Sequence, residues 1–526
     1  MSGTAANIQI NTSTGQGKLD QFLYQPLALK NRIQKLCMEH GCSFQNNELQ
    51  GDKAKVTSIR NYILNSVKDK FSYAFLDKFK PCIPCANAYI QNLHNIRTLH
   101  PTQPSTVDIT VNVDSSAVYI NDQFLVIETE APTSTGNPTA RFRYCEKPGI
   151  RIIRSVELFM NNQLVTSYKR PDVVAYDKIN VYENARHKWN SCIGQDNGLH
   201  ANIYNEDFQF IITKNVKIGY QTYRSDQQGL VLHIPLLFWY NTCVGSSLQV
   251  SNLDRQAIRL RFTLAPQSEI VEGMVFSDDG DFTVPVDPLR IKKFSLYTNN
   301  IYVTDDTHQL LVERDFATLM RIRQSEHVIL TERLFDEHIK FARWALEYLL
   351  VMAQPRTNAE ISNANNFDIW DDFGRTDQIC LPDVVVHNDP NGVADQVVIR
   401  TLTAYTHDKL FQNFYLKSQE EKITPEEWLP EAMGDYMPYK YSQNVQGGLA
   451  TGKDTDGICL YSWSHKPGNL SLNSTLNFSK NREVRMQGSI VSDVDPDTHP
   501  VLVYICSYAV NIFLNEAGRG VRFIAS

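Results

Sequence analysis

The chain has 526 residues, of which 42% are hydrophobic and 21% are charged, and its formal net charge is −7. At roughly 100–200 residues per domain, this length predicts about two to four domains that can each bury a core. Direct nucleic-acid binding is not expected, because it normally requires a strongly basic face.

The N-terminal region differs from the rest of the chain in composition and in the spacing of its apolar residues. The opening residues, "MSGTAANIQINTSTGQGK", are polar and contain no apolar signal-peptide region. Between Leu19 and Lys80, apolar residues recur at spacings of three and four, as in Val56, Ile59 and Ile63, which predicts helix. We therefore expect a disordered arm and a helical extension over residues 1–78, docked on the main body.

After Phe79 the chain consists of short runs rich in β-branched and aromatic residues, such as "STVDITVNV", "LVLHIPLLFWY", "QVVIRTLTAY" and "PVLVYICSYAVNIFL". Clusters of Gly, Pro, Asn and Asp separate these runs. Many short strands without alternating helices favour antiparallel sandwiches or barrels over a parallel sheet. The polar loops between them are long enough to serve as contact surfaces. No stretch approaches eighteen consecutive apolar residues, so no membrane-spanning helix is expected.

Two short stretches look alike: "IRSVELFMNNQLVT" (153–166) and "IKKFSLYTNNIYVT" (291–304). The paired Asn tolerates positive φ and suits a tight turn, so each stretch could be a hairpin.

A further stretch, "LFDEHIKFARWALEYLLVMAQ" (334–354), contains good helix formers. It also alternates Trp344, Leu346, Tyr348, Leu350 and Met352, which is a strand pattern, and periodicity alone does not decide between the two.

Three motifs resemble nucleotide or metal sites. "GGLATGKD" (447–454) has phosphate-loop spacing, but Asp454 replaces the magnesium-binding hydroxyl and a strand-like run follows, so a Gly-rich turn is favoured. "DDFGR" (371–375) lacks the other kinase motifs, and Asp368, Asp371 and Asp372 are expected in a solvated loop rather than at a weak metal site. "DTDG" (454–457) lacks the closing Glu of a calcium loop and is interpreted as a turn.

The ten cysteines are expected to be reduced thiols, because no export signal is present. A zinc site formed by Cys37, Cys42, Cys82 and Cys85 is the alternative, since four thiolates can bind zinc tetrahedrally. The long gap between the two pairs makes structural thiols the favoured interpretation, and a redox role is the least favoured. No Ser-His-Asp or Cys-His order appears in a recognisable context, so neither enzyme activity nor a cofactor is expected.

The most specific stretch is "GICLYSWSHKPGNLSLNSTLNFSKNREVRM" (457–486). It resembles a signature of the major capsid proteins of large nucleocytoplasmic DNA viruses, in which a Tyr-Ser-aromatic strand leads through Pro to Asn-Phe-Ser-Arg. The matching residues are Tyr461, Ser462, Trp463, Pro467, Asn477, Phe478 and Ser479. The sequence departs from the signature at Ser474, often Gly, and at Lys480, usually Arg. Stretches such as "FKPCIPCANAY" and "RWALEYLLVMAQP" look most like the African swine fever virus type of this family.

The resemblance spans about Phe79 to Ser526 and implies an all-β double jelly roll, two eight-stranded antiparallel sandwiches in one chain. The first jelly roll would cover 79–306 and the second 307–526. Residues 291–304 would form the last strand of the first jelly roll, not a position equivalent to 153–166, and 334–354 would be strand.

The implied function is that of a major capsid protein, whose homotrimers form pseudo-hexagonal capsomers that tile an icosahedral shell. Partners implied are other capsomers, minor capsid and penton proteins, and the inner viral membrane beneath the shell. The implied locations are the virion capsid and assembly sites in the host cytoplasm. The helical extension would lie at the capsomer base or clasp a neighbouring subunit.

Aromatic loops without a strand pattern are the candidates for trimer contacts, with Trp370 in "NNFDIWDDFGR" and Tyr436 in "EAMGDYMPYKYSQ". The alternative function is a β-sandwich carbohydrate-binding or cupin-like protein. A cupin would need clustered His and Glu ligands, whereas His233 and His465 are isolated in the sequence.

Overall fold

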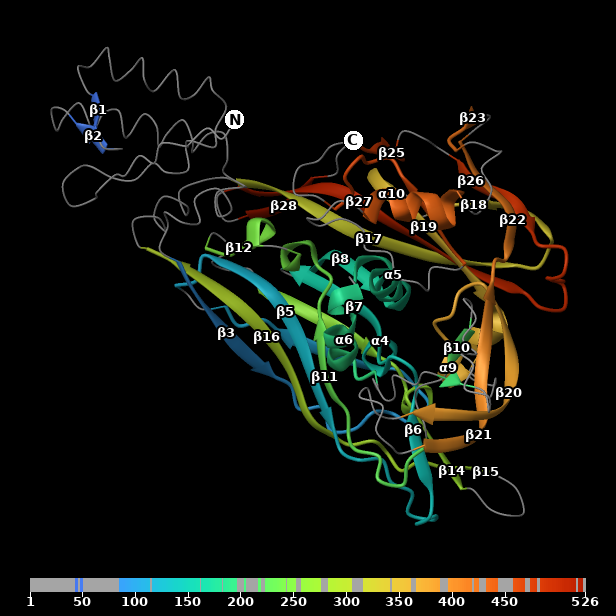
Figure 1. Cartoon of the computed structure of the whole chain (residues 1–526). Helices are drawn as coiled ribbons and strands as arrows, with labels where there is room; N and C mark the ends of the chain where they lie inside the picture. The colour runs from blue at the N-terminus through green and yellow to red at the C-terminus, as the bar shows by residue number, and fades with distance from the viewer. Residues whose placement is uncertain are drawn as a thin grey trace.

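A computed structural model describes residues 43–45, 48–50 and 85–523 of the chain. Within the last range it leaves out 114–115, 161, 182, 196–202, 205–215, 219–222, 243, 252–256, 276–281, 305–315, 341–342, 361–365, 388–395, 419–420, 425–431, 443–456, 469–473, 480–482 and 517–518. Two β-sandwiches lie against each other, with short helices between them (Figure 1).

The first sandwich has two antiparallel sheets. One has the order β11-β5-β16-β3, with β12 beside β5. Its strands are β3 (Cys85–Leu93), β5 (Tyr119–Thr129), β11 (Val231–Pro235), β12 (Leu248–Gln249) and β16 (Ile291–Val303). The other sheet has the order β4-β13-β7-β8. Its strands are β4 (Ser105–Thr110), β7 (Ile153–Met160), β8 (Gln163–Lys169) and β13 (Ile258–Leu264).

Alternation of side chains builds the core between these sheets. In β13, "IRLRFTL", the odd positions are buried and the even ones are partly exposed, as expected for a strand with one face in a core. Phe262 of β13 packs edge-on against Phe294 of β16, with ring centroids 6.1 Å apart. This contact joins the two layers of the sandwich.

The second sandwich is built in the same way. One sheet has the order β17-β27-β19-β24, with β25 beside β19 and β28 beside β27. Its strands are β17 (Phe316–Leu330), β19 (Ala345–Pro355), β24 (Ile458–Ser462), β25 (Leu476–Asn477), β27 (Val501–Glu516) and β28 (Arg519–Phe523). The other sheet has the order β18-β26-β22-β23. Its strands are β18 (Leu334–His338), β22 (Phe411–Ser418), β23 (Glu421–Lys422) and β26 (Val484–Ile490).

Both sandwiches share one strand order. We number the eight main strands of each sandwich in chain order, leaving out β12, β25 and β28. In both sandwiches one sheet then has the strand order 1-8-3-6, and the other sheet has the order 2-7-4-5. The same order twice in one chain is a double jelly roll, with two Greek keys in each sandwich. The expected fold class is therefore confirmed.

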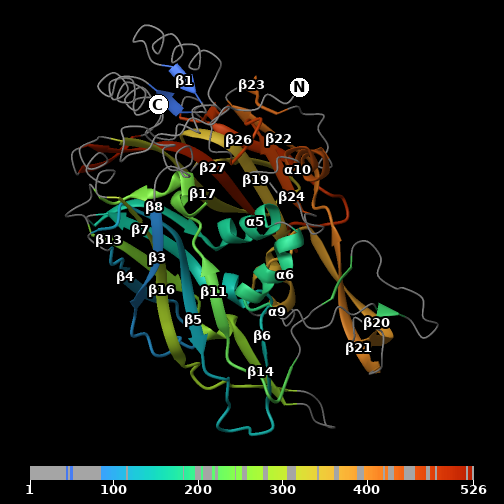
Figure 2. The ribbon, with the colours of Figure 1, turned by 60° about the vertical axis from the view of Figure 1, so that its left-hand side comes forward.

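A further sheet contains strands from both halves of the chain, in the order β10-β21-β20-β9. Its strands are β9 (Ile203–Tyr204), β10 (Val216–Ile218), β20 (Arg375–His387) and β21 (Gln396–Asp408). Val385 pairs with Tyr204, and Val216 pairs with Thr406. The β20–β21 hairpin extends away from the two sandwiches (Figure 2).

The remaining elements are short. A small sheet of order β15-β14-β6 contains β6 (Arg141–Tyr144), β14 (Val271–Val275) and β15 (Phe282–Val284). The α-helices are α4 (Pro148–Arg151), α5 (Arg170–Asn180), α6 (Glu183–Cys192), α8 (Arg356–Ala359), α9 (Asn366–Ile369) and α10 (Met437–Ser442). Single turns of other helix types are η2 (Trp239–Asn241), η3 (Val244–Ser246), η4 (Gln267–Glu269) and η5 (Ala432–Tyr436). No helix among the described residues is long and apolar enough to cross a membrane.

The two similar stretches fold differently. Residues 153–166 contain the β7–β8 hairpin, in which Met160 pairs with Gln163 and Asn162 takes a φ of 64°. Residues 291–303 form one uninterrupted strand, β16, the last of the first sandwich. The expectation that the two stretches are not equivalent is confirmed, and the duplication is one of whole jelly rolls.

The ambiguous stretch 334–354 is strand, as the resemblance implied, in β18 and β19. In the N-terminal region, the described residues form only the antiparallel pair β1 (Ser43–Gln45) and β2 (Glu48–Gln50). The helical stripe around Val56 lies outside the described residues. So do both expected domain boundaries, 78/79 and 306/307, which stay predictions.

Gly457 allows a close approach of two chain segments. Its φ is 79°, and a Cβ there would lie 2.1 Å from the backbone nitrogen of Gly374. Ala353 holds both segments, since its N–H donates to the Gly457 carbonyl (3.1 Å) and its carbonyl accepts from the Gly374 N–H (2.7 Å).

Gly457→Ala is expected to lower the free energy of unfolding by at least about 1–3 kcal/mol, because it adds backbone strain and a clash. Urea denaturation followed by circular dichroism would measure it. Gly434→Ala is the matched control, because a Cβ there meets its nearest atom at 3.5 Å without a positive φ. Equal effects of the two substitutions would contradict the argument.

Candidate functional site: a buried charged junction between the sandwiches

The loop that carries α9 packs against the segment that leads into α4. Two hydrogen bonds join them: the Glu146 N–H donates to the Phe367 carbonyl (2.8 Å), and Trp370 Nε1 donates to the Glu146 carbonyl (2.8 Å). Lys147 precedes Pro148 and has a φ of 46°. The α-helical region of φ and ψ is disfavoured for a residue that precedes proline. Lys147 therefore lies just before helix α4 and is not part of it.

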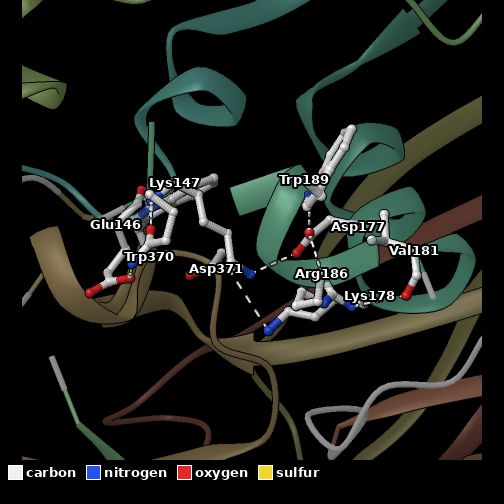
Figure 3. A network of polar contacts seen from close by, with 10 residues as sticks. Glu146, Lys147, Asp177, Lys178, Val181, Arg186, Trp189, Trp370 and Asp371 are labelled. Carbon is white, nitrogen blue, oxygen red and sulfur yellow. Dashed lines mark hydrogen bonds and ion pairs between the residues drawn. The ribbon is translucent and has the colours of Figure 1, made fainter. Parts of the chain in front are cut away.

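Lys147 lies at the centre of the junction (Figure 3). Its Nζ donates to Asp177 Oδ2 of α5 and to Asp371 Oδ2 of the α9 loop, both at 2.7 Å. Arg186 and Trp189 of α6 donate to Asp177 Oδ1, at 2.7 and 2.5 Å. One ammonium group therefore bridges a carboxylate from each half of the chain.

The network is almost dry. The side chains of Asp177 and Asp371 are 0% exposed and that of Lys147 is 14% exposed. Lys178 adds a second cation, 3.9 Å from Asp371. Burial alone would raise the pKa of Asp177, but Lys147, Arg186 and Lys178 together hold that pKa below its ordinary value. The Asp177 carboxylate is thus kept ionised in this buried place by its cations.

The lowered pKa of Asp177 predicts how stability depends on pH. Because the folded-state pKa lies below the unfolded value of about 3.9, the contribution is complete above that pH and is lost as the pH falls through the folded-state pKa. Asp177→Asn should therefore lower the melting temperature strongly at pH 7 and progressively less below about pH 4. Calorimetry of both proteins across this range would test it, and a constant difference would contradict it.

A layer of arginines surrounds the same loop. Arg143 Nη1 donates to both oxygens of Asp368, each at 3.1 Å, and its Nε donates to Glu272. Arg151 lies over the ring of Trp370 at 5.3 Å, and Arg170 lies over the same ring at 5.8 Å. Such cation–π contacts strengthen when they are desolvated, so the loop is anchored by stacking as well as by ion pairs.

One expectation about this loop is wrong, and another stays untested. Asp368, Asp371 and Asp372 are 7%, 1% and 1% exposed, whereas a solvated loop was expected. The reason is that cations distant in the sequence, such as Lys147, neutralise the carboxylates. Trp370 is 7% exposed, which leaves it little surface for another subunit, and its role as a trimer contact stays a prediction.

The other predicted site residues fall in different places. Tyr436 is 55% exposed at the end of η5, so its role as a trimer contact stays a prediction. Cys37, Cys42 and Cys82 lie outside the described residues, and Cys85 is the first residue of β3. "GGLATGKD" also lies outside them. No group of three or more His, Cys, Asp or Glu that could hold a metal occurs within the described part of the chain.

The signature stretch packs around Glu347 of β19. The Glu347 carbonyl accepts from the Trp463 N–H (2.9 Å), and its carboxylate accepts from the Gly468 N–H (3.1 Å). Arg321 of β17 forms a two-bond pair with the same carboxylate, at 3.0 Å for each bond. Trp463 also packs against Phe478, with ring centroids 5.1 Å apart. The signature therefore has a structural role, because it packs on itself and against β19 of the second sandwich.

Sequence reasoning missed the residues at the centre of the junction. Asp177 and Arg186 had no pattern that marked them, whereas Glu347 lies in "RWALEYLLVMAQP", a stretch that contributed to the family resemblance. Charged residues on short helices ordinarily face solvent. Only its three-dimensional partners explain why Asp177 is buried.

No protein-family model matches the chain. It is 27% identical over 187 residues to the hexon protein p72 of an African swine fever virus isolate (Tick/Malawi), covering 31% of this chain and 29% of that protein. It is 24% identical over 176 residues to the major capsid protein of the Warthog/Namibia isolate, covering 30% and 27%. The matched region therefore spans less than a third of the length of these curated relatives.

Solved structures agree in fold over most of the chain. The Faustovirus major capsid protein superposes with a TM-score of 0.65 at 15% identity, covering 89% of this chain and 100% of that chain. The PBCV-1 virus capsid gives 0.56 at 13% identity, covering 84% and 98%. The chain is thus a double jelly-roll protein that resembles the major capsid proteins of large DNA viruses, and its sequence similarity is to the African swine fever virus type.

Proposed function

We propose that this chain is a major capsid protein whose homotrimers form pseudo-hexagonal capsomers of an icosahedral virus shell. The observation that carries the proposal is one strand order found in both sandwiches of a single chain. Three such chains around a three-fold axis place six similar sandwiches in a ring, which approximates a hexagon and can tile a surface.

The charged junction supports this role. A tiling unit must keep a fixed angle between its two sandwiches, because an error in that angle would accumulate across the shell. Lys147, between Asp177 and Asp371, and the mixed sheet of β9, β10, β20 and β21 tie the halves together by independent means. Interfaces within a chain otherwise permit relative motion unless they are large and well packed.

Further parts of the proposal follow from the similar proteins, which are named hexon and major capsid proteins. Neighbouring capsomers, minor capsid and penton proteins, and an inner viral membrane are the proposed partners. The proposed locations are the virion capsid and cytoplasmic assembly sites. The role needs no catalytic step, and a cupin-like or carbohydrate-binding function is not favoured by the names of these proteins.

The test is the mass and shape of the purified full chain. Light scattering at micromolar concentration should give about three times the chain mass of 60.1 kDa. Negative-stain images should show uniform pseudo-hexagonal particles. A stable monomer under these conditions would refute the trimer and most of the capsid proposal.

A further inference from the structure

A cavity of about 490 Å³ lies between the two halves, next to the charged junction. Its walls come from the first half through Arg151, Arg154, Arg170 and Glu269, and from the second half through residues that include Trp370 and Tyr504. Binding pockets for small molecules commonly have volumes of about 300–1,000 Å³. The cavity is therefore large enough for a small organic ligand.

Three arginines and three carboxylates line this cavity, and two of the carboxylates pair with cations outside the lining. Asp371 is neutralised by Lys147 and Lys178, and Glu360 pairs with Arg356 at 2.9 Å. Glu269 alone then faces the three arginines, pairing with Arg154 and with Arg170. After these pairings, the three arginines of the lining exceed the one remaining carboxylate by two charges, which suits a doubly charged anion.

Two of the arginines each have one N–H donor without a partner. These donors are the Nε atoms of Arg151 and Arg170, which are buried and have no hydrogen-bond partner among the described residues. Arg151 as a whole is 2% exposed. Buried polar groups of this kind are nearly always satisfied in folded proteins, so each such donor calls for an acceptor. Guanidinium groups are especially suited to phosphate, which accepts two parallel N–H bonds.

Two further features favour a phosphate ester over a bare ion. Arg170 begins α5, so the positive end of that helix dipole lies at the cavity wall. Trp370, Phe373 and Tyr504 supply an apolar, aromatic wall that a bare phosphate would leave unused. A charged end and an aromatic wall together fit a phosphate that carries a small organic group.

We propose that this cavity binds a phosphate group, free or as a small phosphate monoester, between the two sandwiches. Such a ligand would contact arginines of the first half and aromatic side chains of the second. It would therefore hold the halves together, because any ligand that binds only the folded state stabilises that state.

The test uses the full-length protein dialysed free of phosphate, with inorganic phosphate, adenosine monophosphate and adenosine as probes. Calorimetric titration should show one site per chain for the two phosphate probes and none for adenosine, and both phosphate probes should raise the melting temperature. Tighter binding of the monophosphate would identify an ester as the ligand, whereas equal binding would identify free phosphate.

Variants locate the site. Arg154→Gln, whose side chain is 38% exposed in the wild type, should fold and bind phosphate about tenfold more weakly. Glu269→Gln should bind it several-fold more tightly, because it removes the carboxylate that pairs with Arg154 and Arg170 and competes with phosphate for them. A purely structural role for these residues predicts no such opposite shifts.

Arg485→Gln is the matched control, since Arg485 is an exposed arginine of β26 that pairs with Asp336. Its affinity for phosphate should equal that of the wild type. The proposal is overturned if all variants bind alike, or if sodium chloride at the same ionic strength reproduces the effect of phosphate.

Discussion

Lys147→Met is expected to lower the free energy of unfolding by about 3–5 kcal/mol, because it leaves carboxylates buried without their shared cation. Asp177 and Asp371 each accept a 2.7 Å hydrogen bond from the Lys147 Nζ, and neither side chain is exposed. Methionine nearly preserves the side-chain volume, so the loss reports charge rather than packing. Thermal and urea unfolding of the purified chain would measure it.

Lys293→Met provides the matched control. Lys293 also pairs with a carboxylate, Glu128, at 3.6 Å, but both side chains are about one-third exposed. Solvent screens such pairs and competes with them, so unfolding should hardly change. Similar losses from Lys147→Met and Lys293→Met would mean that the buried network is not what stabilises the junction.

Trp370→Ser is expected to cost about 3–5 kcal/mol of unfolding free energy, as large-to-small changes at buried aromatic residues do. It removes the hydrogen bond to the Glu146 carbonyl and the ring over which Arg151 and Arg170 lie. The substitution should act on the folded chain itself, before any effect on assembly. Urea denaturation at low protein concentration would measure this loss.

Tyr436→Ser should behave in the opposite way. Its side chain is 55% exposed, so the stability of the chain should be nearly unchanged. If the proposed trimer uses this tyrosine, light scattering should detect a larger share of dissociated chains. A strong loss of stability from Tyr436→Ser, or none from Trp370→Ser, would contradict this division of roles.

Local pattern and family resemblance predicted the sandwiches well. Period-two alternation indicated strand across Leu346, Tyr348 and Leu350, and the resemblance decided the assignment of β19. The signature around Trp463 indicated the family, and its Trp463 and Phe478, which are close in sequence, pack on each other. Contacts of this kind leave a recognisable pattern in the sequence.

The junction was not predictable, because its partners are distant in sequence. Asp371 lies in a loop, and nothing near it in the sequence indicates that Lys147 donates to it at 2.7 Å. Partners distant in sequence also decide the structure of the two stretches with paired asparagines, 153–166 and 291–304. Asn162 turns a hairpin, whereas Asn299 and Asn300 stay extended because β5 and β3 pair with β16 on both sides. Long-range pairing overrides the local preference of the same residues.

The mixed sheet has a consequence for synthesis on the ribosome. Tyr204 of β9 pairs with Val385 of β20, so this part of the early chain has no strand to pair with until much later residues emerge. At about 5–20 residues per second, a delay of about 180 residues lasts roughly ten to forty seconds. During that time the first sandwich can close, but the β9 and β10 segments stay exposed to chaperones and to other nascent chains. A polysome that translates many copies at once would therefore bring unpaired β9 segments close to newly made β20 strands of neighbouring chains, where exchange between chains competes with correct closure.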